Sequence, residues 1–138
     1  MILDTAEKLA IHELLSKAAY AYDARDLPML EAGFAESASF SMKIAGGDLV
    51  GPFQGREGII AMYAGAMEAQ TDVRRHVISN LFFDDTAAHV TVISNLTLFA
   101  TENEQVKLLC TGVYRDALVH EDGAWKILDR HLDLDGPH

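Results

Sequence analysis

The spacing of apolar residues changes once along this chain, and that change constrains the fold most strongly. Before about residue 70 the spacing is helical in three separate segments, and the face of the first would hold Ile11, Leu14, Leu15, Ala18 and Tyr22. From residue 73 onwards the spacing is two, which is typical of strands. Strands over 73–83, 88–100, 106–120 and 125–134 would be joined by short polar turns into an antiparallel meander. Helices followed by such a sheet predict an α+β fold.

Local signals predict the elements that precede the meander. Asp4, with Glu7 three residues later, forms a capping-box sequence at the start of the first helix. A short helix should follow Asp26, and a third helix should begin after Gly55. Short strands are expected at 38–42 and 49–53. Strands as long as those of the meander usually bend. We therefore expect one domain over residues 1–138, a cone in which a curved mixed or antiparallel sheet wraps three helices around a cavity.

Charge and cysteine content exclude several classes of function. The chain has 11 Lys and Arg against 21 Asp and Glu, a net charge of −10, which disfavours nucleic acid and anionic membranes as partners. Its single cysteine, Cys110, excludes a disulfide scaffold. The N-terminal residues are too polar for a secretory signal, so we expect a cytoplasmic protein. No nucleotide or flavin motif is present in the sequence, and we expect no cofactor.

Three polar positions fall on or beside apolar faces. Arg130 alternates with Leu128 and Leu132, so it is either a buried ion-pair partner or a fixed positive charge lining a pocket. His76 shares a predicted strand face with apolar residues and Asn80, and would be either a core histidine or a general base.

The third position is Asp23, which follows Tyr22 at the end of the first helix. A carboxylate there opposes the helix dipole, so it is either solvated or placed to fix the tautomer of an imidazole. Asp129, His131 and Asp133 share the opposite face of the last strand, where a solvated surface is a better reading than a metal site.

Motifs along residues 6–132 resemble the SnoaL-like branch of the nuclear-transport-factor-2-like superfamily. They are I-x-E-L-L and A-Y-D-A-R-D-L in the first helix, then G-R-E-G-I, R-H-V-I-S-N-L, G-V-Y-R-D and D-G-A-W-K-I-L-D-R. The pattern is most similar to scytalone dehydratase, bile acid 7-alpha-dehydratase and hexachlorocyclohexane dehydrochlorinase. The resemblance implies that Asp23 pairs with His76, that Tyr22 belongs to the site, and that Arg130 completes it. A second active-site histidine of scytalone dehydratase is replaced here by the region of Phe99 and Ala100.

These observations predict a cofactor-independent lyase of the dehydratase or dehydrohalogenase type. His76 would be the general base, oriented by Asp23, while Arg130 stabilises the leaving group or enolate and Tyr22 donates a hydrogen bond. The substrate would be small, hydrophobic and cyclic, bound by Phe53, Met62, Tyr63, Ile78, Asn80, Phe82 and Phe99. The alternatives are a ketosteroid-isomerase-like isomerase, a polyketide cyclase, a non-catalytic binding module or an oxygenase small subunit. The resemblance also implies a homodimer or homotrimer.

Overall fold

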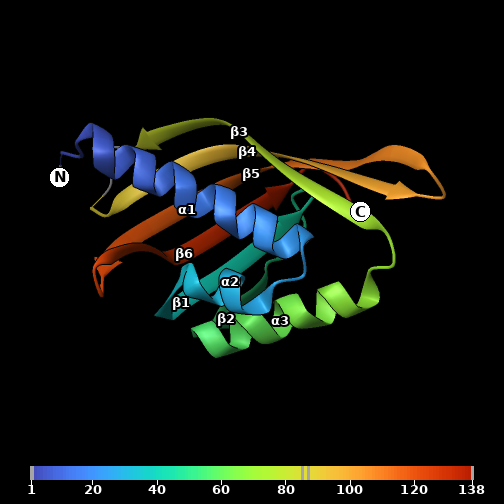
Figure 1. The fold of residues 1–138 in the computed structure, drawn as a ribbon, viewed down its shortest axis with the longest axis horizontal. Helices are drawn as coiled ribbons and strands as arrows, with labels where there is room; N and C mark the ends of the chain where they lie inside the picture. Colours follow the sequence, from blue (N-terminus) through green and yellow to red (C-terminus); the bar gives the residue numbers. More distant parts are fainter. Residues whose placement is uncertain (1, 85, 87, 138) are drawn as a thin grey trace.

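The computed structural model describes residues 2–84, 86 and 88–137. Asp85, where the first long strand was expected to end, and His138 lie outside these residues. The elements in chain order are α1 (Thr5–Asp23), α2 (Leu27–Ala32), β1 (Phe34–Ile44), β2 (Val50–Gln54), α3 (Arg56–Ala69), β3 (Val73–Asp84), β4 (Val90–Glu102), β5 (Gln105–Glu121) and β6 (Ala124–Leu134). The predicted α+β fold is confirmed: three helices pack against one curved, mixed, six-stranded sheet (Figure 1).

The expected helix caps are present. The Asp4 side chain accepts a hydrogen bond from the Glu7 amide, while the Glu7 side chain accepts one from the Asp4 amide. Asp26 caps α2 through the Met29 amide, and Gly55, with a φ of 82°, precedes α3. The Asp4 and Asp26 side chains satisfy amide groups that have no partner inside their own helix, whereas Gly55 makes no such side-chain contact.

The sheet runs in the order β2-β1-β6-β5-β4-β3, so β2 and β3 form its two edges. All neighbouring pairs are antiparallel except β1 and β6, which pair in parallel from Phe34↔Ile127 to Ile44↔Leu134. This long-range pairing makes β1 longer than the predicted strand at 38–42. Register shifts within three of the pairings of β3–β6 increase the local twist, as bulges do, and help to curve the sheet.

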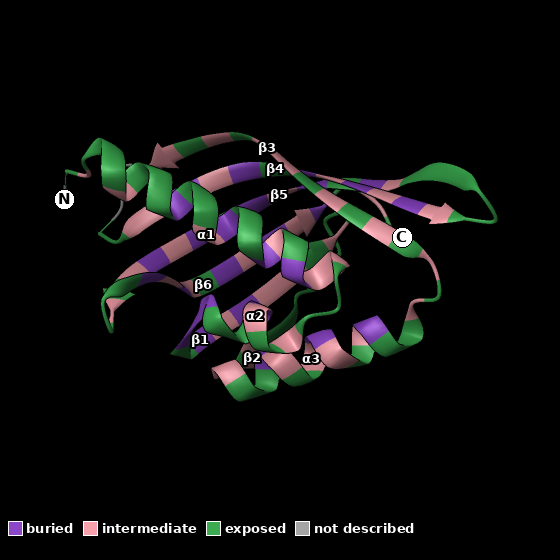
Figure 2. Ribbon diagram, viewed as in Figure 1, coloured by how far each residue is buried: buried purple, intermediate pink, exposed green. Residues whose placement is uncertain are grey.

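The helices cover the concave face of the sheet. α1 packs against β3, and α3 packs against β1 and β2 (Figure 1). Figure 2 shows buried residues alternating along β4, β5 and β6 and recurring on one side of α1. Ile11, Leu15, Ile59, Leu96 and Ile127 are fully or almost fully buried between these layers. No helix among the described residues has the length and apolarity needed to cross a membrane.

Candidate active site

A cavity of about 110 Å³ lies between α1, α3 and the concave face of the sheet. Its lining is mostly apolar and aromatic, with a few polar groups from α1, α3 and β3. The lining residues are Tyr22, Phe40, Met42, Met62, Tyr63, Ala66, Gln70, His76, Leu96, Leu98, Tyr114, Leu132 and Leu134. Such a lining suits a small, largely apolar molecule that a few polar contacts orient.

Asp23 and His76 meet at one side of this cavity, as the sequence predicted. Asp23 is the last residue of α1, and its Oδ1 lies 2.6 Å from His76 Nδ1. Asp23 Oδ2 also accepts a hydrogen bond of 2.9 Å from the His76 backbone amide. This second contact is available because β3 is an edge strand, and Asp23 satisfies an amide at its open side.

The two contacts decide which nitrogen of His76 faces the cavity. The side chains of His76 and Asp23 are 7% and 11% exposed, so the pair is largely shielded from water. An ionised carboxylate only accepts hydrogen bonds, so Nδ1 carries the proton that Asp23 receives. In the neutral ring Nε2 therefore has a free lone pair, and among the described residues the hydrogen bond of the His76 ring is the one at Nδ1. This arrangement is suited to taking a proton from a bound molecule.

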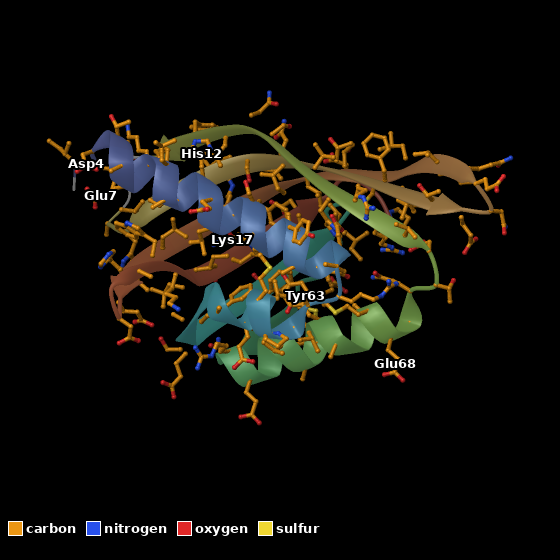
Figure 3. The ribbon with its side chains drawn as sticks, in the orientation of Figure 1. Asp4, Glu7, His12, Lys17, Tyr63 and Glu68 are labelled. Atoms are coloured by element: carbon orange, nitrogen blue, oxygen red, sulfur yellow. The ribbon has the colours of Figure 1, made fainter. Side chains whose placement is uncertain are left out.

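Three tyrosine side chains lie along the cavity beside this pair. The Tyr22 ring is 4.5 Å from the His76 ring between centroids, and 5.2 Å from that of Tyr63. Figure 3 shows Tyr63 in the interior between α3 and α1, whereas Glu68 of the same helix points outward. Burial raises the pKa of Tyr22, Tyr63 and Tyr114, so these hydroxyls stay protonated well above neutral pH. They are therefore hydrogen-bonding groups at neutral pH rather than charges.

Arg130 is buried as predicted, but it forms an ion pair instead of lining the cavity. Its Nε and Nη2 donate to the two carboxylate oxygens of Asp116 at 2.8 and 3.2 Å, and both side chains are almost completely buried. The guanidinium lies 4.2 Å from the centre of the Tyr114 ring, which does line the cavity. Burial opposes the charge of Arg130, but the attraction of Asp116 keeps its pKa above the usual value. Arg130 is therefore a buried ion-pair partner, the first of its two predicted roles, rather than a positive charge lining the pocket.

Several residues expected in the substrate pocket lie elsewhere. The β3–β4 register shifts between Ser79 and Phe82, and Asn80 has a φ of 54°. The side-chain alternation of β3 therefore reverses at this irregularity: Asn80 is exposed and Phe82 is 54% exposed. Both expectations were wrong because an alternation read from sequence assumes an unbroken strand.

The alternation of side chains along β4 explains why Phe99 also does not line the cavity. Leu98 and Ala100 are buried on the concave face, so Phe99 between them faces the opposite side. Leu96 and Leu98 line the cavity in its place, and Met62 and Tyr63 line it as expected. Phe53 and Ile78 are half-buried and pack against the core; the lining does not include them.

The sequence interpretation missed two residues that shape the site, Asp116 and Gln70. Asp116 shares the buried face of β5 with Tyr114 and Leu118, a period-two signal that marks it as a partner for Arg130. Gln70 donates a hydrogen bond of 2.8 Å from Nε2 to the Tyr22 hydroxyl oxygen. No local pattern indicates Gln70, because it caps the C-terminus of α3 and only the tertiary fold brings it to α1.

The surface histidine on β6 belongs to a different environment. His131 lies 2.8 Å from the Ser41 hydroxyl and 2.9 Å from Asp133, while Asp129 accepts a hydrogen bond from Ser39. Among the described residues, no three His, Cys, Asp or Glu side chains are grouped so that they could hold a metal ion. The side chains of this strand face are thus held by neighbouring polar groups.

Solved structures with the same fold cover almost the whole chain. A protein of unknown function with a cystatin-like fold from Nostoc punctiforme has a TM-score of 0.80 and 21% identity, over 98% of this chain and 96% of that one. A protein from Catenulispora acidiphila in complex with S-DNPA has a TM-score of 0.81 and 21% identity, over 96% of both chains. A proposed scytalone dehydratase from Novosphingobium aromaticivorans has a TM-score of 0.74 and 24% identity, over 94% of this chain and 84% of that one.

Sequence comparison identifies the family. No curated protein sequence matches the chain. The SnoaL-like domain, however, matches residues 4–131, which is nearly the full length. Proteins with this domain include dehydratases, isomerases and polyketide cyclases. The match and the shared architecture agree with the resemblance found in the sequence motifs, and the chain belongs to the SnoaL-like domain family.

Proposed function

We propose that the protein is a cofactor-independent lyase that removes water or a halide from a small cyclic substrate. The observation that carries this proposal is the Asp23–His76 pair, with Nδ1 held at 2.6 Å and Nε2 left for the cavity. General-base catalysis by such an imidazole typically contributes about 10²–10⁴-fold to a rate. A proton next to a carbonyl, an activated ring or a halogen is acidic enough for this base.

The reaction balances with the groups that line the cavity. His76 Nε2 takes the proton from carbon, and the electrons of that C–H bond form the new double bond. The bond to the leaving group breaks on the neighbouring carbon. A leaving hydroxyl receives the proton back from the His76 imidazolium and departs as water. A halide departs as the anion with the electrons of its bond to carbon, and the imidazolium then releases its proton to solvent. Asp23 stabilises the imidazolium that exists between these steps.

Tyr22 would donate a hydrogen bond to the substrate oxygen. Burial raises the pKa of its hydroxyl, which favours hydrogen-bond donation over full proton transfer. Arg130 was expected to stabilise the leaving group or enolate, but its guanidinium is already paired with Asp116. We therefore assign that stabilisation to Tyr22. We propose that the Arg130–Asp116 pair holds the Tyr114 ring in place, because the guanidinium lies against that ring.

The cavity volume restricts the substrate to about one ring. A cavity of about 150 Å³ lined by apolar side chains holds benzene, and the volume here is smaller, about 110 Å³, so it leaves no room for a second ring. We therefore propose a neutral monocyclic substrate, such as a cyclic hydroxyketone or a halogenated ring. The neighbour that holds S-DNPA supports a small-molecule pocket in this fold. The neighbour proposed as a scytalone dehydratase supports elimination chemistry.

The alternative reaction is isomerisation or cyclisation at the same site. The same base would return the proton to another carbon, or the enolate would attack within the molecule. The family, which includes isomerases and cyclases, favours this second candidate. We also propose that the protein is cytoplasmic, from its polar N-terminal residues, and a homodimer or homotrimer, in line with the sequence resemblance.

A mass-resolved screen tests the proposed function. Monocyclic hydroxyketones and halogenated rings are incubated with the protein in deuterated buffer, with His76→Ala as the matched blank. Loss of water or halide that needs His76 supports the lyase. Deuterium uptake without loss of mass supports the isomerase instead. A reaction that proceeds equally in the blank contradicts a role for this histidine.

A further inference from the structure

Gln70 and Tyr22 form a directed hydrogen bond at the cavity. The Gln70 carboxamide lies at the C-terminal end of α3, and its Nε2 donates to the Tyr22 hydroxyl oxygen at 2.8 Å. Both residues line the cavity with His76. Tyr22 is half-buried and stacks near the His76 ring, with 4.5 Å between the ring centroids. The His76 ring, the Tyr22 ring and Gln70 therefore belong to the lining of the same cavity.

The backbone around Gln70 is tied to the end of α1. Arg25, directly after the C-cap of α1, has a φ of 55°. Its Nη2 donates to the backbone oxygens of Gln70 at 2.6 Å and Asp72 at 3.2 Å. Asp72 in turn pairs with Arg74 at 2.9 Å. The segment that carries Gln70 is thus anchored on the same turn that presents Tyr22 and Asp23, which limits its freedom to move relative to the site.

A phenol has one hydrogen to donate and lone pairs that accept. When the Gln70 amide donates to the oxygen, the hydroxyl hydrogen of Tyr22 must point elsewhere. Among the residues that the structure describes, the hydrogen bond of this hydroxyl is the one it accepts from Gln70. The hydrogen therefore remains available to a bound molecule in the cavity.

We propose that Gln70 is a positioning residue that fixes Tyr22 as a hydrogen-bond donor toward an uncharged substrate oxygen. This inference rests on the proposed function and narrows it, because the substrate must then carry a carbonyl or hydroxyl oxygen, and a halogenated ring without one is excluded. The absence of cationic side chains from the described cavity lining favours an uncharged substrate group. No Lys or Arg belongs to the described cavity lining, and Arg130 beneath Tyr114 is neutralised by Asp116. A phosphate or carboxylate group would meet no free cation there.

The sign of a pKa change tests the direction of this hydrogen bond without any substrate. Tyrosines are labelled with ¹³C at Cζ, and Tyr22 is assigned by the signal that disappears in Tyr22→Phe. A donor to the phenol oxygen stabilises the phenolate, so its removal in Gln70→Met should raise the pKa of Tyr22, by about one pH unit. A fall in this pKa would show that the hydroxyl donates to Gln70, and no change would show that the bond is absent. Either result overturns the proposal.

A second variant and a kinetic measurement complete the test. Near-ultraviolet circular dichroism checks folding, and Gln70→Leu replaces Gln70→Met if the latter fails to fold. With a substrate from the screen, Gln70→Glu should lower kcat about tenfold or more, since a carboxylate can only accept from the hydroxyl. Unchanged kcat in this variant overturns the positioning role. Failure of the lyase proposal leaves the titration result intact, so the two claims fail separately.

Discussion

Asp23 contacts His76 at two atoms, accepting from the backbone amide at 2.9 Å and lying 2.6 Å from ring Nδ1. The backbone contact fixes the carboxylate on the edge of β3, and the ring contact fixes the imidazole relative to the same carboxylate. The orientation of the ring therefore depends on the backbone of both α1 and β3 rather than on a flexible side chain alone. Preorganisation of this kind is what a general base requires.

Replacing Asp23 with asparagine should change the tautomer of His76. The amide oxygen of Asp23→Asn can still accept from the His76 backbone, but its NH₂ group would then face Nδ1. We expect the ring proton to move to Nε2 and turnover to fall by about 10²–10⁴-fold. Two-dimensional ¹⁵N–¹H spectra of the imidazole report the tautomer directly. A variant that keeps the Nδ1–H tautomer and full activity would contradict this assignment.

Breaking the buried ion pair should destabilise the protein strongly. Asp116→Leu alone leaves the Arg130 charge buried without its partner, which typically costs about 3–5 kcal/mol. The double variant Arg130→Met with Asp116→Leu removes both charges, so we expect it to lose less stability than the two single changes combined. Urea unfolding of the four proteins gives the coupling free energy. Additive effects would show that the two side chains do not stabilise each other.

Stability should decrease in alkaline solution because of the buried tyrosines. Burial raises the pKa of Tyr63 and Tyr114 above the unfolded value of about 10. The folded state then holds protons that the unfolded state loses, so stability is complete below about pH 10 and falls above it. Urea midpoints at neutral and alkaline pH measure the effect. Tyr114→Phe should show a smaller alkaline loss than the unchanged protein, and an equal or larger loss would contradict the assignment.

Filling the cavity should abolish function without unfolding the protein. Ala66 lines the cavity from α3, and Ala66→Leu adds three carbon atoms to a space of about 110 Å³. We expect turnover of a monocyclic substrate to be lost while the urea midpoint stays close to that of the unchanged protein. Ala69→Leu, at an exposed position of the same helix, is the matched control and should remain active. Full activity in Ala66→Leu would show that the reaction occurs elsewhere.

Local signals predicted the elements of this fold well. The capping box at Asp4 and Glu7, the cap at Asp26 and the turn at Gly55 depend on neighbours only three or fewer residues away. The parallel pairing of β1 with β6 joins residues about 90 positions apart, and no local pattern records it. That pairing is what extends β1 beyond the predicted strand.

The sequence predicted a polar site residue correctly where that residue lies on or beside an apolar face and away from an irregularity in its element. Asp23 stands out because a carboxylate at the C-terminal end of a helix opposes the helix dipole, and His76 because it shares a strand face with apolar residues. The resemblance to the family then pairs them. Asn80 and Phe99 were misplaced for two different reasons: an irregularity reverses the alternation in β3, and β4 carries apolar residues on both faces. Gln70 reaches Tyr22 across 48 residues, a contact that only the packing of α3 against the rest of the fold creates.

The most direct test of the account is the rate constant of His76→Ala with a substrate that the protein turns over. His89→Ala, which removes an exposed histidine directly before β4, is the matched control and should keep its activity. We predict that kcat of His76→Ala falls by about 10²–10⁴-fold while the protein stays folded. A folded His76→Ala protein with unchanged kcat would contradict the proposal that this histidine is the base.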